Sequence, residues 1–402
     1  MKINKQTFDV VILGGGAAGL MCALTAGNRG KRVLVLEVSN KLGKKILMSG
    51  GGRCNFTNIN IAADNFICHN PHFVKSALNQ YTQWDFISMV EARGIAYHEK
   101  DQGQLFCDNS AKDILRMLVD QCRAVGVKFL LDCEVSSVSQ NTPFELQSTA
   151  GVFITRNLVV ATGGLSIPTL GGATGFGYLI AKQFDMKVTA TQASLVPFTL
   201  TGKWHDFSRA LSGVSVSAEV SVNAARFSEN LLFTHRGISG PAILQISNYW
   251  QSGETVSVDL LPAINLHEEF VRAKRNRPKD RISSYLMPHL PKSLVQALYR
   301  ELWEKEQDHE KNLQQFKDSE LLQIATQINN WQLLPSGTEG YRTAEVTRGG
   351  VDVSSISSKT MRHVDVQGLY FIGEVLDVVG HLGGYNFQWA WSSGFAAGMA
   401  LD

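Results

Sequence analysis

The sequence predicts an α/β protein whose main domain is interrupted by an insertion. Strands alternate with helices in the first part of the chain, as in βαβ units around a parallel sheet. The pattern then changes to alternating strands and afterwards to highly charged helices, and a glycine-rich apolar pattern returns after residue 343. We therefore expect a discontinuous α/β domain, an inserted β domain and an inserted helical subdomain, which correspond to 1–192 with 343–402, 193–262 and 263–342.

The composition excludes several classes of protein. With 402 residues, 44% of them hydrophobic and 18% charged, the chain is long enough for two or three domains and is neither disordered nor fibrous. Its formal net charge of +2 favours neither a nucleic acid nor an anionic membrane as partner. An uncharged run over 10–27 contains five glycines, which makes a membrane-spanning helix a poor interpretation.

The six cysteines predict neither a metal site nor a disulfide framework. They include no Cys-x-x-Cys pair and no zinc-type spacing. We expect reduced thiols in a cytoplasmic protein.

Apolar runs define the elements of the first part. They predict strands over 8–13, 32–37, 127–131 and 157–162, with helices over 73–93 and 111–125.

The insertion has two regions with different sequence patterns. The strict alternation over 214–222 predicts a half-exposed strand, and 231–234 and 255–260 predict two more. The segment 267–320 contains 21 charged residues among 54, with apolar residues such as Leu294, Leu298 and Leu302 at helical spacing. This pattern predicts helices with a solvated face.

A glycine fingerprint follows the first predicted strand and opens a helix. Gly14, Gly16 and Gly19 form Gly-x-Gly-x-x-Gly, and Glu37 ends the second strand 18 residues beyond Gly19. In a Rossmann-type domain these glycines make the tight turn, admit a pyrophosphate and let the helix pack closely. Glu37 would accept hydrogen bonds from a ribose diol, and its charge disfavours a cofactor with a 2′-phosphate.

Three further segments favour FAD as the dinucleotide. A cationic, glycine-rich loop over 44–55 follows the second strand. Small residues end the strand before Gly163, and the strand before Glu374 leads into a second apolar helix. Such loops and helix ends can run along the pyrophosphate and the flavin of an extended FAD.

At these segments the sequence resembles the two-dinucleotide-binding-domain flavoproteins, and within them the BaiN-like (YhiN-type) family. The match is carried by the fingerprint, by the block at 49–58 that begins Ser-Gly-Gly-Gly-Arg-Cys-Asn, and by four other blocks at 171–177, 233–241, 347–351 and 373–394. The resemblance implies a Rossmann-type FAD-binding domain with an inserted β-barrel plus helical subdomain. It also implies an FAD-dependent oxidoreductase, with reduction of an activated C=C bond as its reaction class.

The fingerprint, the three segments and the resemblance together give a set of expected FAD contacts. The expected contacts are Gly14, Gly16, Ala17, Ala18, Gly19, Glu37, Lys45, Gly51, Gly52, Arg53, Cys54, Val135, Ala161, Thr162, Gly163, Gly373, Glu374, Asn386 and Phe387.

Candidate catalytic groups lie in the same blocks. His381 or Tyr385 could protonate a carbanion after hydride delivery, and Asn55 is expected near the flavin ring. A thiol–disulfide reductase is disfavoured, because Ile59 stands where a partner cysteine for Cys54 would be expected. NAD(P)H could serve as a transient electron donor, although no second fingerprint with a ribose acid is present.

Two hypotheses for the substrate remain open. We expect a small organic molecule rather than a nucleic acid. The alternative is a flavoprotein acting on RNA through its helical insertion, where six basic residues lie between Arg272 and Arg281. Acidic residues further along the insertion offset this run, namely Glu301, Glu304, Glu306, Asp308 and Glu310.

Overall fold

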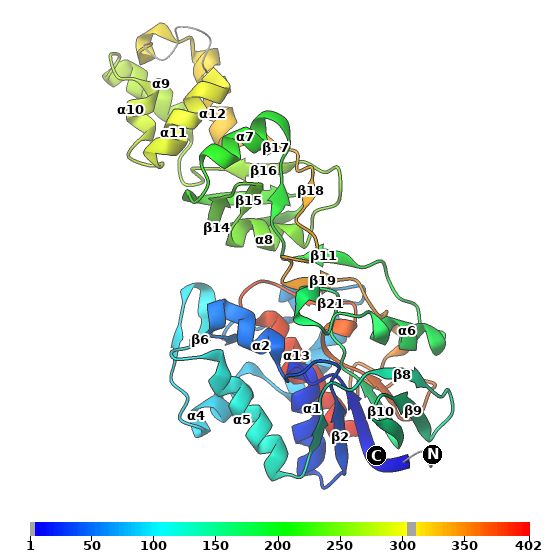
Figure 1. Cartoon of the computed structure of the whole chain (residues 1–402). Coiled ribbons are helices and arrows are strands. Elements are labelled where there is room, and N and C mark those ends of the chain that lie inside the picture. Colours follow the sequence, from blue (N-terminus) through cyan, green and yellow to red (C-terminus); the bar gives the residue numbers. More distant parts are fainter. Residues whose placement is uncertain (1–4, 304–310) are drawn as a thin grey trace. The chain divides into compact units, whose positions relative to one another are not determined.

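The computed structural model describes residues 5–303 and 311–402, and the chain divides into two compact units (Figure 1). The first unit contains Met1–Ala193 and Glu345–Asp402, so both ends of the chain belong to it. The second unit is Ser194–Ala344. The side chain of Leu302 and the acidic residues between 304 and 310 lie outside what the structure describes.

A mostly parallel sheet forms the centre of the first unit. Its strands run in the order β7 (Lys128–Leu130), β2 (Val33–Leu36), β1 (Lys5–Leu13) and β10 (Gly151–Val160), all parallel. The second half of β10 pairs in parallel with β20 (Leu369–Phe371), and its first half pairs antiparallel with β9 (Phe144–Ser148). The other edge of β9 pairs antiparallel with β8 (Val135–Val138). The central strands are buried along their apolar runs, as expected for a sheet covered on both faces.

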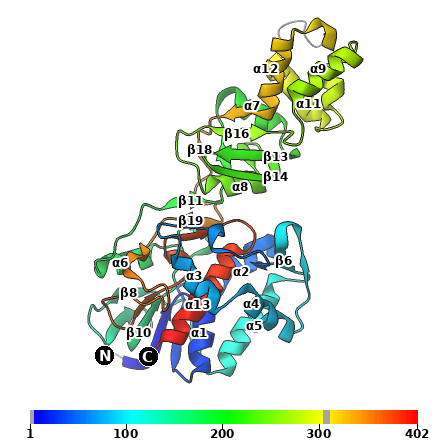
Figure 2. The ribbon, with the colours of Figure 1, turned by 180° about the vertical axis from the view of Figure 1, so that it is seen from behind.

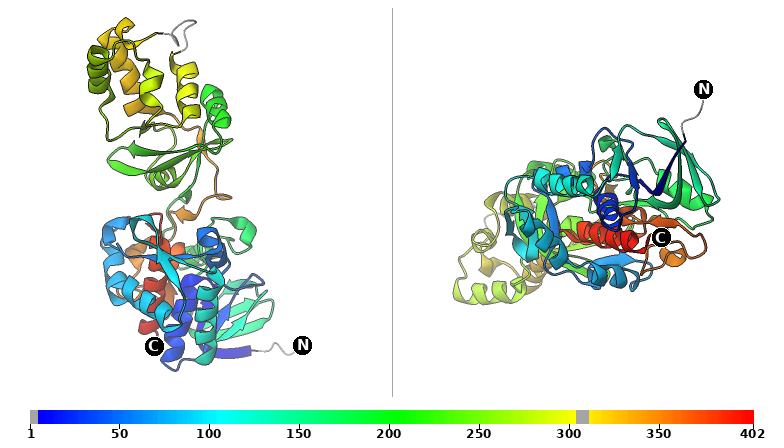
Figure 3. Two further views of the ribbon diagram at one scale, coloured as in Figure 1. Left: turned by 90° about the vertical axis from the view of Figure 1, so that its left-hand side faces the viewer. Right: turned by 90° about the horizontal axis from the view of Figure 1, so that it is seen from below.

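The first and last helices of the chain pack against one another. α1 (Ala17–Asn28) follows β1, and α13 (Tyr385–Ala400) ends the chain (Figure 3). A Cβ added at Gly394 would lie 2.5 Å from the carbonyl oxygen of Ala18, and one at Gly398 would lie 2.5 Å from the Cβ of Thr25. Glycines one turn apart on α13 therefore allow this close approach.

The helix expected over 73–93 is in fact two helices. α3 (Phe73–Gln80) ends before an extended Tyr81, and α4 (Gln83–Ala92) begins after Thr82. Thr82 and Asp85 form a capping box, because the Thr82 Oγ1 accepts from the Asp85 N–H and the Asp85 carboxylate accepts from the Thr82 N–H. The expected helix over 111–125 corresponds to α5 (Ala111–Ala124), which Ser110 caps.

Short elements complete the first unit around the sheet. Two small sheets pair β3 (Asn55–Asn58), β6 (Gln104–Cys107) and β5 (Tyr97–Glu99), and β21 (Val378–Gly380) with β4 (Phe66–Cys68). The remaining elements are α2 (Lys44–Met48), α6 (Phe176–Gln183), and the paired strands β11 (Gln192–Ser194) and β19 (Val346–Arg348), of which β11 ends at the unit boundary.

The second unit begins with a seven-stranded antiparallel sheet. The alternation over 214–222 becomes β13 (Ser215–Val222), in which Val216, Ala218, Val220 and Val222 are buried. It forms a long hairpin with β14 (Ala225–Phe233) (Figure 2). The sheet order is β17 (Trp331–Leu333), β16 (Val256–Asp259), β13, β14, β15 (Gly237–Ser239), β12 (Phe198–Thr199) and β18 (Gly337–Thr338).

Helices complete the second unit and share one hydrophobic core with its sheet. Those beside the strands are α7 (Gly202–Ala210) and α8 (Pro241–Ser247), and those of the charged region are α9 (Leu266–Asn276), α10 (Ile282–Leu286), α11 (Lys292–Leu298) and α12 (Asp318–Asn329). Leu294 and Leu298 are fully buried, as their spacing predicts. Among the helices that the structure describes, none is both long and apolar enough to cross a membrane.

Candidate cofactor and active site

In the turn between β1 and α1, Gly14 and Gly19 are packed tightly against neighbouring backbone, whereas Gly16 borders open space. Gly14 has a φ of +108°, and a Cβ there would lie 2.3 Å from the carbonyl oxygen of Ala161. A Cβ at Gly19 would lie 2.0 Å from the carbonyl oxygen of Gly14, whereas one at Gly16 would meet no heavy atom within 4 Å. Gly16 is the N-cap of α1, and no side chain caps it. The helix start can therefore receive an anionic group such as a pyrophosphate.

Glu37 lies directly beside this turn. Its side chain is buried, and the carboxylate accepts hydrogen bonds from the backbone N–H groups of Gly15 (2.7 Å) and Ser39 (2.9 Å). The Cys133 N–H donates to the Glu37 carbonyl oxygen at 3.0 Å, which brings the segment before Val135 next to this acid. Val135 is buried at the start of β8.

The loop after α2 contains a run of left-handed backbone. Gly50, Gly51 and Gly52 have φ values of +58°, +64° and +86°. A Cβ at Gly51 or Gly52 would meet no heavy atom within 4 Å, so both glycines border open space. The Arg53 side chain is exposed next to them, whereas Cys54 is fully buried and burial raises the pKa of its thiol to about 12. Cys54 is therefore a packed thiol and not a reactive one.

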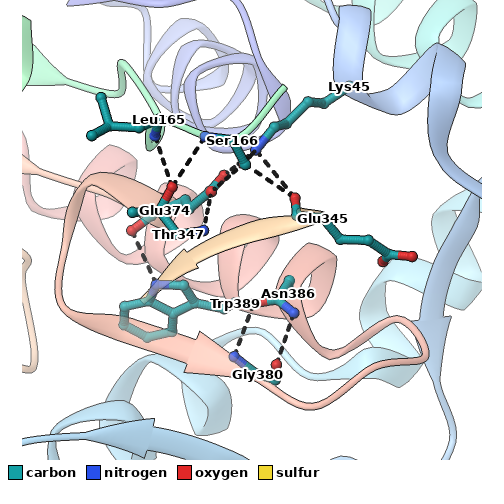
Figure 4. Close-up of polar contacts among 10 residues, drawn as sticks. Lys45, Leu165, Ser166, Glu345, Thr347, Glu374, Gly380, Asn386 and Trp389 are labelled. Atoms are coloured by element: carbon teal, nitrogen blue, oxygen red, sulfur yellow. Dashed lines mark hydrogen bonds and ion pairs between the residues drawn. The ribbon is translucent and has the colours of Figure 1, made fainter. Parts of the chain in front are cut away.

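A polar cluster joins three distant parts of the chain (Figure 4). The Lys45 Nζ lies 2.6 Å from the Glu374 Oε2 and donates to the Ser166 Oγ at 2.5 Å. The Glu374 Oε1 accepts from the Thr347 N–H at 2.9 Å and from the Ser166 hydroxyl at 3.0 Å. The backbone carbonyl of Glu345 faces the Lys45 Nζ, while the Glu345 carboxylate points away (Figure 4).

The segment after β10 meets this cluster. Gly163 has a φ of +71°, and a Cβ there would find the Glu374 Oε2 at 4.0 Å as its nearest neighbour. A Cβ at Gly164 would lie 2.7 Å from the Glu374 Oε1. The hydroxyl of Thr162 is buried and has no hydrogen-bond partner within the described part of the chain. Ala161 packs against Gly14, so this segment connects the glycine turn with Glu374.

The three candidate catalytic residues gather at the start of α13. The His381 and Tyr385 rings meet edge to face with their centroids 6.0 Å apart, and burial lowers the pKa of His381. With the amide nitrogen of Asn55 directed at the carbonyl oxygens of Thr57 and Leu105, its oxygen lies 3.3 Å from the Gly384 nitrogen. Because its pKa is lowered, His381 is neutral near pH 7.

Asn386 and Phe387 support this region from the first turn of α13. The Asn386 side chain accepts from the Gly380 N–H at 2.8 Å and donates to the Gly380 carbonyl oxygen at 2.9 Å (Figure 4). It also donates to the His381 carbonyl oxygen at 3.3 Å. Its amide therefore positions the loop that carries His381. Phe387 stacks on Trp391, with the ring centroids 5.5 Å apart.

Several residues that hold the site together were not expected from the sequence. The Asn58 amide donates to the Gly383 carbonyl oxygen at 2.9 Å, and the Thr57 hydroxyl donates to the Gln388 Oε1 at 2.7 Å. Gln104 lies beside Asn55, with 3.0 Å between their amide groups. Asn58 and Thr57 belong to the Ser-Gly-Gly-Gly-Arg-Cys-Asn block, but the partners are far away in sequence and no local pattern indicates them.

The geometry fits an extended dinucleotide. Open glycine positions lie at Gly16, Gly51 and Gly52, a buried acid lies at the end of the second strand, and a lysine–glutamate pair lies beside the segment after β10. Two ends of the chain supply these groups. The first glycine turn suits the pyrophosphate and Glu37 suits a ribose, as the fingerprint requires.

Comparisons with known proteins place this chain in a family. The family model described as "HI0933-like protein Rossmann domain" matches residues 8–400. Two proteins named "Ribosomal RNA dihydrouridine synthase" are similar along their full length. The one from Escherichia coli (strain K12) is 50% identical over 98% of each chain, and the one from Haemophilus influenzae (strain ATCC 51907 / DSM 11121 / KW20 / Rd) is 51% identical over 99% of each.

A more distant relative supports the resemblance seen in the sequence. The "3-dehydro-bile acid delta(4,6)-reductase" of Clostridium scindens (strain ATCC 35704 / DSM 5676 / VPI 13733 / 19) is 29% identical over 97% of this chain and 98% of its own. Together with the parallel sheet and its glycine turn, these matches confirm the expected fold and the expected cofactor. The protein belongs to the HI0933-like family and is an FAD-dependent oxidoreductase with a Rossmann-type domain.

Proposed function

We propose that the protein reduces uracil bases in ribosomal RNA to dihydrouridine. The observation that carries this proposal is the identity of 50–51% over 98–99% of both chains to two proteins with that activity in their names. The match includes the inserted unit as well as the glycine turn. This proposal takes up the RNA alternative that the basic run in the insertion left open.

The reaction belongs to the class expected from the sequence, reduction of an activated C=C bond. The C5=C6 bond of uracil is conjugated with the C4 carbonyl, so a hydride can add at C6 if a proton reaches C5. Reduced FAD supplies a hydride when it is bound. The more distant relative is named for reduction of double bonds in an oxidised bile acid, which is chemistry of the same class.

We assign the protein's part of the reaction to two sets of residues. The glycine turn, Glu37 and the Lys45–Glu374 pair hold the cofactor, because Glu37 lies beside that turn and Glu374 lies beside the glycines that follow β10. His381, Tyr385 and Asn55 form the second set, next to the start of α13. A tyrosine hydroxyl or a neutral imidazole N–H in this set would deliver the proton to C5 and fix the orientation of the base.

A small enone is the second candidate substrate, because the bile acid reductase matches almost the full chain. Its identity is 29%, against 50–51% for the two RNA enzymes. If the substrate is ribosomal RNA, the protein acts in the cytoplasm. The higher identity favours the RNA substrate.

The test is to supply the reduced holoenzyme with both substrates. Ribosomal RNA transcribed in vitro, which contains no modified bases, and a 3-oxo-Δ4 steroid are incubated separately with NADPH or NADH under nitrogen. We expect dihydrouridine in the RNA by nucleoside mass spectrometry and no saturated steroid. Ribosomal particles are tested in the same way as the transcribed RNA. If the steroid is reduced and neither form of the RNA gains dihydrouridine, the proposal is overturned in favour of the small-molecule function.

Tyr385→Phe separates the proton-delivery role from folding. The variant keeps the ring that packs on His381 and Phe66 and loses only the hydroxyl. We expect FAD content to be unchanged and the rate of dihydrouridine formation to fall by about 10²-fold or more, in line with the usual contribution of a general acid. An unchanged rate would remove Tyr385 from the catalytic set and leave His381 to be tested in the same way.

A further inference from the structure

The basic run between Arg272 and Arg281 divides into two groups of three cations. Three are used inside the second unit: Arg272 pairs with Glu269, Arg277 pairs with Asp280 at 3.4 Å, and Lys274 lies 2.8 Å from Asp318. The Lys274 Nζ also donates to the Phe316 carbonyl oxygen at 2.7 Å. These three cations help to hold the helical region together.

The other three cations are Arg275, Lys279 and Arg281. All three are exposed, and within residues 5–303 and 311–402 none forms an ion pair or a side-chain hydrogen bond. They lie at the end of α9 and in the loop that leads to α10. The segment therefore presents three exposed cations outside the ion pairs of the described residues, although Arg275, after Lys274, also helps to lower the pKa of Asp318.

The loop is fixed by backbone hydrogen bonds. The Leu313 N–H donates to the Asp280 carbonyl oxygen at 2.8 Å, and the Gln314 N–H donates to the Pro278 carbonyl oxygen at 3.0 Å. Within the loop, the Asp280 N–H donates to the Arg277 carbonyl oxygen at 3.0 Å. The backbone that carries the three cations is thus held in place before any partner arrives, which lowers the entropic cost of binding.

We propose that Arg275, Lys279 and Arg281 form a phosphate-binding surface for the RNA substrate. This inference rests on the proposed function. Exposed lysine and arginine side chains bind nucleic acid by neutralising phosphates and releasing counterions, without reading sequence. A membrane is a poorer partner, because the apolar residues of α9, Leu266 and Phe270, are fully buried in the core and leave no apolar face for a bilayer.

The surface explains how a chain of nearly neutral charge can hold RNA. The whole protein has no strong attraction for RNA, but three exposed cations at the end of α9 and in the loop after it provide local contacts. The surface belongs to the second unit, whereas the candidate FAD contacts belong to the first. Loss of these cations should therefore weaken RNA binding and leave flavin binding unchanged.

The test compares two triple variants of the FAD-loaded full chain. The first, Arg275→Ala with Lys279→Ala and Arg281→Ala, removes the proposed surface. The control, Arg93→Ala with Lys112→Ala and Arg116→Ala, removes the same charge from exposed cations of the first unit, for which the described residues show no ion pair. The probe is a fluorescein-labelled oligouridylate, and binding is followed by fluorescence anisotropy at several KCl concentrations.

We expect the first variant to bind the probe about 10- to 100-fold more weakly at low salt, with full flavin absorbance. The slope of log K against log salt should fall by about two, because each phosphate contact on a single strand contributes about 0.7. The control should bind as the unmodified protein does. Equal weakening in both variants, or no weakening in the first, would overturn the proposed surface.

Two further measurements keep this inference separate from the proposed function. Dihydrouridine formation at an unchanged rate and affinity in the first variant contradicts only the surface. If the unmodified protein binds RNA but forms no dihydrouridine, and the triple variant loses that binding, only the proposed function is contradicted. Vesicles of phosphatidylglycerol serve as the competing anionic probe, and loss of vesicle binding with RNA binding retained would overturn the surface in favour of a lipid.

Discussion

The polar contacts of the candidate site in the first unit and those of the basic run in the second differ in how far apart their partners lie in the sequence. In the first unit, Lys45 pairs with Glu374 and Asn58 donates to Gly383, so each contact joins residues more than three hundred positions apart. In the basic run, Arg272 pairs with Glu269 and Arg277 with Asp280, three positions away in each case, and Lys274 pairs with Asp318, 44 positions away. Long-range contacts define a site that exists only after the whole unit has folded. The two local pairs of the basic run stabilise single turns, and the neighbouring exposed cations form the proposed RNA surface.

The largest expected effect comes from breaking the contact between the first and last helices. Gly394→Leu would force a side chain onto the Ala18 carbonyl, which a Cβ alone approaches to 2.5 Å. We expect a loss of about 3 kcal/mol in the free energy of unfolding, typical of strong overpacking, together with loss of bound FAD. Urea unfolding followed by tryptophan fluorescence measures this. Gly172→Ala is the control, because a Cβ there meets no heavy atom within 4 Å, and equal stability of the two variants would contradict the packing argument.

Glu37→Lys tests whether the first unit binds FAD through this buried acid. Lysine cannot accept the hydrogen bonds that the carboxylate receives from Gly15 and Ser39, nor those of a ribose diol. We expect FAD binding to weaken by about 1–3 kcal/mol and the purified protein to be largely colourless. The exposed neighbour Glu134→Lys makes the same change of charge and should stay yellow. A Glu37→Lys protein with full flavin content would show that this acid does not contact the cofactor.

Glu374→Ala addresses the long-range cluster itself. The change leaves the Lys45 ammonium, the Ser166 hydroxyl and the Thr347 N–H without their shared acceptor. We expect FAD affinity to fall by about tenfold, equivalent to one or two lost hydrogen bonds to a charged group. Glu374→Gln keeps an acceptor and should lose less. Isothermal titration of the apoprotein with FAD ranks the two variants, and the reverse order would contradict the assignment.

The smallest expected effect concerns the pH dependence of stability. Burial lowers the pKa of His381, so as the pH falls the unfolded chain takes up this proton before the folded one does. The stability that neutral His381 contributes is complete above its ordinary pKa of 6.5 and is lost as the pH falls below that value. His381→Asn should therefore lose less stability than the unmodified protein between pH 7.5 and pH 5, about the range in which histidine titrates. An equal loss of unfolding free energy in the two proteins between about pH 7.5 and pH 5 would argue against a buried His381.

Local sequence patterns were sufficient to predict the elements around the cofactor turn. The fingerprint, Glu37 and the apolar strands depend on spacings of a few residues, and the sheet contains β1, β2, β7 and β10 where these patterns lie. The helix break at Tyr81 was missed, although Thr82 and Asp85 have the spacing of a capping box, because the apolar periodicity continues across it. The hairpin of β9 and β10 was missed because the residues before β10 are mostly polar.

The candidate site was harder to predict than the fold. Lys45 and Glu374 were each expected near FAD, but their direct pairing depends on which loops the sheet brings together. Asn386 was expected as a cofactor contact, and its amide proves to be used by Gly380 and His381. Contacts such as Asn58 to Gly383 have no signature in a single sequence, because neither residue type nor spacing identifies the partner.

The most direct test of the account is a single-turnover experiment. Holoenzyme is reduced to completion under nitrogen, freed of excess reductant and mixed with unmodified ribosomal RNA. Reoxidation of the flavin is followed by its visible absorbance, and the RNA is then digested and analysed for dihydrouridine. We predict one dihydrouridine for each flavin that is reoxidised. Flavin that stays reduced in the presence of RNA, or that is reoxidised without forming dihydrouridine, would contradict the proposed function.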